Sequence, residues 1–253
     1  MTGFYATIAR YYDAEHYDKS EDLPLYEDLA EDYGSPILVV GGGTGRVMLH
    51  LAQLGHTVHG IEIESAMIER AQRKLAGAPA LRERVTFHVG DALHLSLELQ
   101  ARLTIIPYNT LMHFHEQADQ LALLRRARAW TAAGGVLAVD LPNAGEAFAA
   151  MDTGAVTLER TFLEPESGHL VMQHSVSELD RVEQLMHVTW IYDEVTADGT
   201  VRRTVAPVVN RYFFFPEMQL LLTACGFEDV EVYGDLDLSP FVDGCPRMVV
   251  LAK

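Results

Sequence analysis

The sequence ILVVGGGTGR, residues 37–46, places four glycines within five positions directly after an apolar run. The apolar run predicts a buried strand, and the residues that follow, GRVMLHLAQLG, have the apolar spacing of a helix. Glycine is favoured where a backbone turns sharply or where a ligand comes very close to it. The stretch therefore predicts a strand, a tight turn and a helix, and it raises the question of what lies against the turn.

The glycine spacing separates several kinds of turn. The dinucleotide fingerprint GxGxxG needs a third glycine at the position of Arg46, which disfavours a nicotinamide or flavin oxidoreductase. A phosphate-binding P-loop needs Gly-Lys where Arg46-Val47 stands. The pattern that fits is GxGxG, formed by Gly41, Gly43 and Gly45. A tight turn without a ligand remains the alternative for an isolated glycine cluster.

Strand and helix patterns alternate four times over residues 36–142. The strands are continuous apolar runs, which is typical of a parallel sheet covered on both faces. We therefore predict an α/β fold with a doubly wound, mostly parallel sheet. One of its helices is expected to begin after Ser65 as N-cap, and another to span residues 116–135.

The remaining segments complete a single domain over residues 1–253. Two helices are expected within residues 1–34, the first of them rich in tyrosine. Strand-like segments separated by turn residues predict an antiparallel lid insertion over about residues 150–215. A helix and two closing strands follow, which we expect to form a C-terminal antiparallel hairpin.

The amino-acid composition limits the kinds of binding partner that we expect for this protein. The chain has 36 acidic and 19 basic residues, a net charge of -17, so nucleic acid and anionic membrane surfaces are poor partners. No stretch approaches the roughly 20 apolar residues of a membrane span, and the N-terminus does not resemble a signal peptide. The two cysteines form no CxxC pair, which favours reduced thiols, no metal site and a cytoplasmic protein.

Two carboxylates accompany the glycine turn. Glu62 ends the second predicted strand, where an acid beside such a turn can accept hydrogen bonds from a ribose diol. Asp91 ends the third, where a carboxylate can accept a hydrogen bond from an adenine amino group. A solvent-exposed strand end for Glu62 and a turn cap for Asp91 are the structural alternatives. Carboxyl ends of parallel strands meet at one edge, so the three features together predict an adenosyl site.

These residues resemble class I S-adenosylmethionine-dependent methyltransferases. The segment ILVVGGGTGRVMLHLAQLGHTVHGIEIESAMIERAQ, followed by VGDAL, is similar to their first three motifs, and IIPYNTLMHF to their fourth. The tyrosine-rich start, the lid and the closing hairpin resemble bacterial small-molecule N-methyltransferases of the amino-sugar and glycine types. The resemblance implies a Rossmann-like sheet, S-adenosylmethionine as cofactor, S-adenosylhomocysteine as product and a small-molecule methyl acceptor.

The resemblance also implies roles for individual residues. Gly41, Gly43 and Gly45 would let the backbone approach the methionyl part of the cofactor, and Glu62 would hold its ribose. The other cofactor-binding candidates are Ile63 and Met67 packing on the adenine, Asp91 and Ala92 at the adenine edge, Tyr12, Tyr17 and Arg46 near the amino-acid end or the acceptor, and Pro107, Tyr108 and Asn109 beside the methyl group. Family members usually carry an acid two positions before the first glycine, where this chain has Val39.

Methyl transfer needs alignment, a dry site and an acceptor lone pair. His113, which follows the fourth strand, is the candidate base or acceptor-orienting group, and Tyr12 is a second catalytic candidate. A histidine bonded only to backbone is the structural alternative for His113. His113, His115 and Glu116 are too few and too closely spaced to predict a metal site.

We therefore expect methyl transfer to a small molecule, with nitrogen as the acceptor atom. An O-methyltransferase is one alternative, and a non-catalytic binding protein that kept the fold is another. The exposed lid sheet would allow a homodimer. Lid candidates for the acceptor site are His174, His187, Trp190, Tyr192, Arg211 and Tyr212, of which strand alternation turns about half inward. For most of them, the aromatic core of a half-buried sheet is the structural alternative.

Overall fold

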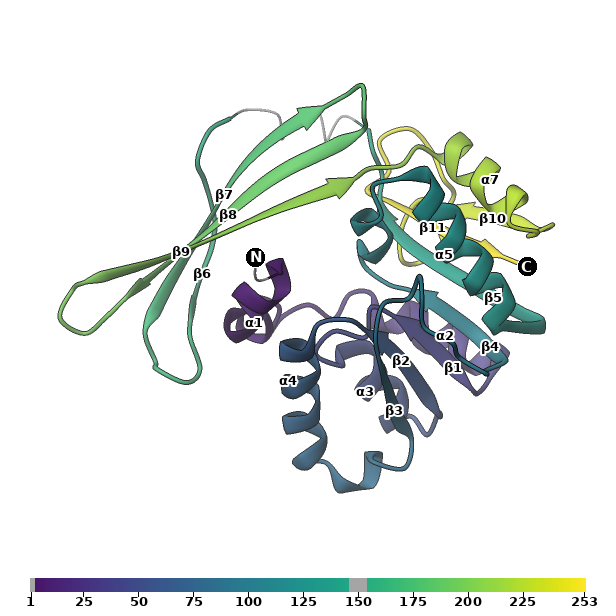
Figure 1. Ribbon diagram of the computed structural model, residues 1–253, viewed down its shortest axis with the longest axis horizontal. Coiled ribbons are helices and arrows are strands. Elements are labelled where there is room, and N and C mark those ends of the chain that lie inside the picture. Colours follow the sequence, from purple (N-terminus) through teal and green to yellow (C-terminus); the bar gives the residue numbers. More distant parts are fainter. Residues whose placement is uncertain (1–2, 146–153) are drawn as a thin grey trace.

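A seven-stranded sheet with the order β10-β11-β5-β4-β1-β2-β3 forms the centre of the computed structural model, which describes residues 3–145 and 154–253 (Figure 1). The strands are β1 (Ile37–Val40), β2 (Val58–Glu62), β3 (Val85–Val89), β4 (Ala101–Ile106), β5 (Thr131–Pro142), β10 (Val230–Tyr233) and β11 (Arg247–Ala252). Neighbours from β3 to β5 pair in parallel, whereas β11 is antiparallel to both β5 and β10. The expected doubly wound sheet with a closing hairpin is confirmed.

Helices cover both faces of this sheet, and those that pack on it present an apolar stripe to it. The helices are α1 (Phe4–Glu15), α2 (Leu23–Tyr33), α3 (Arg46–Gln53), α4 (Ser65–Ala76), α5 (Gln117–Trp130) and α7 (Phe215–Ala224), with short 3-10 turns η1 (Pro79–Leu81) and η2 (Thr110–His113). Helices α2 and α3 pack on one face, and α5 and α7 pack on the other. The chain order turns back between β1 and β4, so the carboxyl ends of β1, β2 and β4 surround the switch point.

Two expected boundaries were wrong. The helix expected over 116–135 ends at Trp130, because Gly134 has a φ of 76° that no helix contains, and a Cβ on Gly135 would lie 2.7 Å from the carbonyl oxygen of Arg102. These residues instead begin β5 against β4. Ser65 lies inside α4, whose N-cap is Glu64 without a side-chain capping bond.

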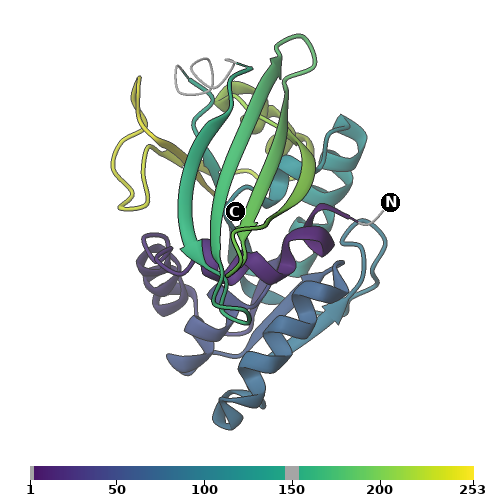
Figure 2. The same cartoon turned by 90° about the vertical axis from the view of Figure 1, so that its left-hand side faces the viewer.

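A second, four-stranded antiparallel sheet forms the lid, with the order β6-β7-β8-β9. Its strands are β6 (Thr157–Leu163), β7 (Leu170–Asp180), β8 (Leu185–Val195) and β9 (Val201–Arg211). The expected start of the insertion, near residue 150, lies outside the described residues. Helix α1 lies between the lid and the central sheet (Figures 1 and 2). The inner face of the lid buries Phe162, Val171 and Tyr192 against Ile8 and Tyr11 of α1.

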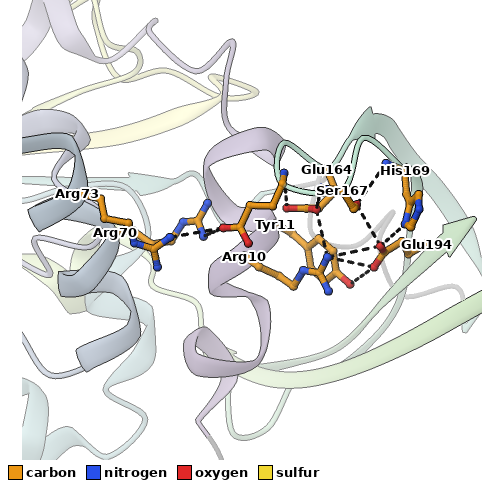
Figure 3. Close-up of polar contacts among 9 residues, drawn as sticks. Arg10, Tyr11, Arg70, Arg73, Glu164, Ser167, His169 and Glu194 are labelled. Atoms are coloured by element: carbon orange, nitrogen blue, oxygen red, sulfur yellow. Dashed lines mark hydrogen bonds and ion pairs between the residues drawn. The ribbon is translucent and has the colours of Figure 1, made fainter. Parts of the chain in front are cut away.

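Polar contacts fix the β6–β7 turn of the lid on α1 and α4 (Figure 3). Arg10 of α1 donates to Glu164 at 3.2 Å and forms an ion pair with Glu194 at 3.4 Å. Glu166 lies 3.5 Å from both Arg70 and Arg73 of α4. The lid is therefore held at its far end by α1 and α4, as well as by apolar packing.

Candidate functional site

The glycine turn connects β1 to α3 at the switch point of the sheet. The amides of Gly41 and Gly42 both donate to the carbonyl oxygen of Ile61, at 2.9 Å each, which ties the turn to β2. Gly41 has a φ of 76°, and an added Cβ would lie 2.7 Å from the Thr110 side chain. Gly43 has a φ of 55°, and an added Cβ would have Met67 Cε as its closest side-chain neighbour, at 3.9 Å. The first glycine permits close packing and the second leaves the backbone open.

Glu62 holds the turn with its carboxylate. It accepts hydrogen bonds from the amides of Gly43 at 2.7 Å and Glu64 at 2.8 Å. The residue is only 8% exposed, so the solvent-exposed alternative does not apply. Burial raises the pKa of Glu62, although the amide bonds oppose that rise. Each oxygen accepts one of these bonds and retains capacity to accept another from a ligand hydroxyl.

Val39 stands where the resembling sequences usually carry an acid. Carboxylates from other elements contact the glycine turn instead. Val39 is buried in the apolar core, while Glu62 binds the turn from β2. Asp13 of α1 accepts a hydrogen bond from the Thr44 hydroxyl at 2.6 Å and an ion pair from Lys74 at 2.6 Å. Nothing in the sequence pattern pointed to Asp13 or Lys74, because they lie on helices distant in sequence from the turn.

The carboxyl ends of β2 and β3 form the next part of the site. Ile63 is a large apolar side chain that is 66% exposed, and it lies beside buried Met67. Asp91 accepts hydrogen bonds from the Leu93 amide at 2.8 Å and from His94 Nδ1 at 2.9 Å. Burial raises the pKa of Asp91, but these hydrogen bonds outweigh it and leave the pKa lowered. Asp91 is thus a turn cap that also borders the cavity.

The segment after β4 has a strained backbone. Tyr108 and Asn109 have φ values of 43° and 40°, in the left-handed region that non-glycine residues rarely adopt. Such strain persists where the surrounding structure holds it in place, and it is concentrated at functional sites. The turn carries Pro107, Tyr108 and Asn109 to the cavity and leads into η2, which ends at His113.

His113 faces the N-terminal helix. Its Nε2 lies 2.8 Å from the hydroxyl of Tyr5 in α1. Burial lowers the pKa of His113 to about 4, and the neighbouring His115 adds to this shift. The imidazole is therefore neutral at physiological pH. The alternative of a histidine bonded only to backbone does not apply, since its partner is a side chain.

These residues border one cavity of about 520 Å³. Of the residues expected from the sequence, those lining it are Tyr12, Gly41, Gly43, Arg46, Glu62, Ile63, Met67, Asp91, Ala92, Pro107, Tyr108, Asn109 and His113. Gly45 lies at the N-cap of α3, outside the lining, with a φ of 83°. Tyr17 is 79% exposed and also lies outside the lining.

Arg46 lines the cavity but is already paired. Its guanidinium donates two hydrogen bonds to the carboxylate of Asp22, at 2.5 and 2.6 Å. Asp22 is buried, so this bidentate pair joins the beginning of α2 to that of α3. The expected role of Arg46 at the amino-acid end of a cofactor remains a prediction.

Several lining residues were not expected from the sequence. They include Phe4, Tyr5, Glu15, His16, Phe114 and Asn210. Tyr5 stands seven positions before Tyr12, which places both on one face of α1. That helical spacing is the signal that could have identified Tyr5. Asn210 could not be identified in this way, because its strand contains both inward and outward polar residues.

The six lid residues that were candidates for the acceptor site differ in whether they line the cavity. Trp190 lines the cavity, whereas His187 is exposed on the outer face of the lid. Tyr192 is fully buried and its hydroxyl donates to Glu15 at 3.0 Å. Arg211 is buried and bonds Glu217 at 2.6 Å. His174 and Tyr212 do not line the cavity.

An adenosyl ligand fits the groups that border the cavity. At Gly43 the open backbone leaves room that a side chain would occupy. Exposed Ile63 offers an apolar surface of the kind that a flat base covers. Glu62 offers two carboxylate oxygens, each with remaining capacity to accept a hydroxyl bond. These three features lie along the carboxyl ends of β1 and β2, where open α/β sheets bind ligands.

Comparison with known proteins agrees with this geometry. Residues 37–135, which include β1 to β4 and the glycine turn, match a protein-family model described as a methyltransferase domain. No curated protein matches the chain. Residues 37–135 thus match a methyltransferase domain, and the resemblance seen in the sequence motifs is confirmed.

Solved structures match the fold over nearly the whole chain. The CcbJ methyltransferase from Streptomyces caelestis is 24% identical, with 95% of each chain covered and a TM-score of 0.76. An S-adenosylmethionine-dependent methyltransferase from Clostridium acetobutylicum is 11% identical, with coverage of 96% of this chain and 95% of the other, and a TM-score of 0.79. The sugar N-methyltransferase KedS8 from a Streptoalloteichus species is 20% identical, covers 94% of this chain and 89% of the other, and has a TM-score of 0.74. The lid and the N-terminal helices therefore belong to the shared fold.

Proposed function

We propose that the protein transfers a methyl group from S-adenosylmethionine to an amine nitrogen of a small molecule. The observation that carries the proposal is the cavity at the switch point, where Gly43, Glu62 and Asp91 meet His113 within one lining. The methyltransferase domain over residues 37–135 supports the enzyme class and the cofactor. S-adenosylhomocysteine is then the product that remains after transfer.

Residues at different places along the cavity would contact different parts of the cofactor. Glu62 would hold the ribose, Ile63 and Met67 would cover the adenine, and Asp91 with Ala92 would border its edge. The open turn at Gly43 would face the methionyl part. Bound S-adenosylmethionine supplies a methyl group attached to a positively charged sulfur. This sulfur is a good leaving group when its bond to the methyl group breaks. The chain has to align the acceptor, exclude water and accept a proton.

His113 is proposed to accept that proton. A nitrogen that gains a methyl group becomes positively charged and must release a proton to end as a neutral amine. The imidazole of His113 is neutral because burial lowers its pKa to about 4, so it can accept a proton, and at Nε2 this would replace the hydrogen bond with the Tyr5 hydroxyl. Tyr5 and Tyr12 would position the acceptor around it. Nitrogen is favoured as acceptor atom by the similarity to a sugar N-methyltransferase, whereas an O-methyltransferase would need a stronger base.

Other parts of the proposal concern the setting of the enzyme. No helix in the described parts of the chain is long and apolar enough to cross a membrane. A cytoplasmic location, expected from two free cysteines, and the absence of a nucleic-acid partner, expected from a net charge of -17, are proposed on those grounds. A homodimer through the lid sheet also remains a prediction.

Calorimetric titration with S-adenosylmethionine tests the donor site. We expect Glu62→Gln to weaken binding about tenfold or more, because it replaces an ionised acceptor that supports both the ribose and the turn. Glu64→Gln is the matched control, since only its main-chain amide takes part in the site. No heat from the unaltered protein at high micromolar S-adenosylmethionine would contradict the proposed function. Binding without methyl transfer to any amine or alcohol would favour a non-catalytic binding protein.

A further inference from the structure

A second cavity of about 320 Å³ adjoins the one described above. The two cavities share Glu15, His16, Tyr108 and Trp190 in their linings. The second cavity lies between the carboxyl end of α1 and the inner side of β6 and β7, which contribute Arg160 and Gln173. A molecule larger than the transferred methyl group can therefore extend from the first cavity into the second.

Glu15 is a buried carboxylate between these cavities. It is 8% exposed, and its oxygens accept hydrogen bonds from the amide nitrogen of Gln173 and from the Tyr192 hydroxyl. Both donors are neutral. Arg160 donates to the main-chain carbonyl oxygen of Glu15, but among the described residues no lysine or arginine forms an ion pair with the Glu15 carboxylate. A buried charge without a counter-charge is costly, and a cationic ligand in the cavity would offset that cost.

Glu159 adds a second negative charge to the same lining. Its carboxylate accepts a hydrogen bond from the Ser175 hydroxyl, and no ion pair neutralises it within the described ranges. Glu159 is exposed, whereas Glu15 is buried. The two carboxylates thus place one charge at the outer side of the cavity and one at its inner end.

The lysine and arginine side chains that line the two cavities already form ion pairs with carboxylates of the chain. Arg46 is paired with Asp22 at 2.5 Å, Lys19 with Glu21 at 2.6 Å, and Arg160 with Asp18 at 3.0 Å. These are the lysine and arginine residues that line either cavity in the part of the chain described here. A phosphate group would therefore face unpaired carboxylates without a free cation to bind it.

We propose that the methyl acceptor binds across the two cavities and is a phosphate-free amine that enters as an ammonium, whose positive charge is recognised by Glu15 and Glu159. One proton passes to His113, the base of the proposed function, before the nitrogen lone pair forms the N–CH3 bond and the S–CH3 bond breaks, so the methylated product is again an ammonium. This inference rests on the proposed methyl transfer and names the substrate class of that site. Free amino sugars and amino alcohols belong to this class, whereas nucleotide-linked and phosphorylated amines do not.

Matched pairs of amines test the proposal with the full-length protein. Glucosamine is compared with glucosamine 6-phosphate, and ethanolamine with O-phosphoethanolamine. Methyl transfer is followed by mass spectrometry, and binding is followed by calorimetry in the presence of S-adenosylhomocysteine. We expect kcat/KM for a free amine to exceed that for its phosphorylated partner by about tenfold or more. Equal or better turnover of the phosphorylated partner would overturn the proposal.

Two glutamine variants separate charge recognition from general damage. We expect Glu15→Gln to raise the KM for the free amine about tenfold and exposed Glu159→Gln about threefold, with kcat changed less than about twofold. Glu178→Gln, exposed on the same sheet and outside both cavities, is the matched control. If Glu15→Gln fails to fold, the surface variant Glu159→Gln still decides the question.

Different experimental results would contradict this inference and the proposed function. An unchanged KM in Glu159→Gln, or no binding and no methylation of either free amine by a protein that binds S-adenosylmethionine, would overturn the substrate class alone. A protein that does not bind S-adenosylmethionine would overturn the proposed function itself.

Discussion

His113 sits in an environment that keeps its imidazole uncharged. Burial in the cavity wall is the main cause, and it lowers the pKa of His113 to about 4, from an unperturbed value near 6.5. Between these two pH values the unfolded chain binds a proton at this position and the folded chain does not. The free energy of unfolding therefore rises with pH over this interval, and His113 destabilises the fold as the pH falls from 6.5 to 4.

Replacement of His113 by glutamine should remove that pH dependence. Since each pKa unit corresponds to about 1.4 kcal/mol, we expect the variant to lose about 3 kcal/mol less stability than the unaltered protein between pH 6.5 and 4. Urea unfolding at several pH values measures this difference. The control His187→Gln changes an exposed histidine on the outer face of the lid. A variant whose stability falls with acid as steeply as that of the unaltered protein would show that His113 is protonated in the folded state.

Individual site residues were predictable only where a local pattern carries them. Gly41 and Gly43 were expected because the turn after β1 needs positive φ values, and Glu62 because it ends the next parallel strand. Glu15 was not expected, since its contacts come from β7 and β8 more than 150 positions away. A residue whose environment is formed by distant segments has no signature in its own neighbourhood.

At the scale of elements, the lid depends on a small polar cluster beside α1. Glu164 and Glu194 are both buried, and both contact Arg10. Burial would raise the pKa of Glu164, but hydrogen bonds from Ser167, the amide of Glu166 and Arg10 outweigh it and lower the pKa to about 2. A depressed acid pKa stabilises the fold above the unfolded pKa of about 4.5, and this contribution is lost as the pH falls toward 2.

Removal of Arg10 should loosen the lid. We expect Arg10→Ala to lower the free energy of unfolding by about 1–2 kcal/mol, because two buried carboxylates lose their shared cation while solvent already reaches the half-exposed guanidinium. Arg73→Ala is the matched control, since its contact with Glu166 is exposed and long at 3.5 Å, and we expect a change below about 0.5 kcal/mol. Chemical denaturation of the two variants gives both values. Equal losses of stability in the two variants would show that the buried ion pairs of Arg10 hold the lid no better than the exposed contact of Arg73.

The elements themselves were largely predictable, because each one repeats its apolar spacing over several residues. Strands β1, β2 and β4 and helices α3 and α4 follow patterns that are complete within each segment. The boundary between α5 and β5 was not, because Ala132 and Ala133 are strong helix formers that continue the helical pattern of α5. Pairing with Ala101 and Leu103 of β4 makes this segment extended, and that pairing comes from a distant part of the chain.

At the scale of the whole molecule, the apolar residues that the structure describes in the lid pack against other elements of the chain. Met186, Val188 and Tyr212 belong to the same buried cluster as Leu111 and Met112, beside the central sheet. Further along the lid, Phe162, Val171 and Tyr192 are covered by α1, which also contacts α4. A sheet with one apolar face needs such a cover to be stable, so α1 links the lid and the methyltransferase domain. The sequence could not reveal this, because strand alternation does not say what covers the inner face.

The packing of the lid on α1 and on the core beside the central sheet predicts that the chain unfolds as one domain. We expect differential scanning calorimetry of the full-length protein to show a single transition whose calorimetric and van't Hoff enthalpies agree, since loss of the lid would expose α1 and the core beneath it together. Bound S-adenosylmethionine should raise the midpoint of this one transition, because it binds only the folded chain. In the Arg10→Ala variant the transition should move to lower temperature without dividing. Two resolved transitions, of which only one responds to the ligand, would instead show that the lid folds independently and would contradict a single domain over residues 1–253.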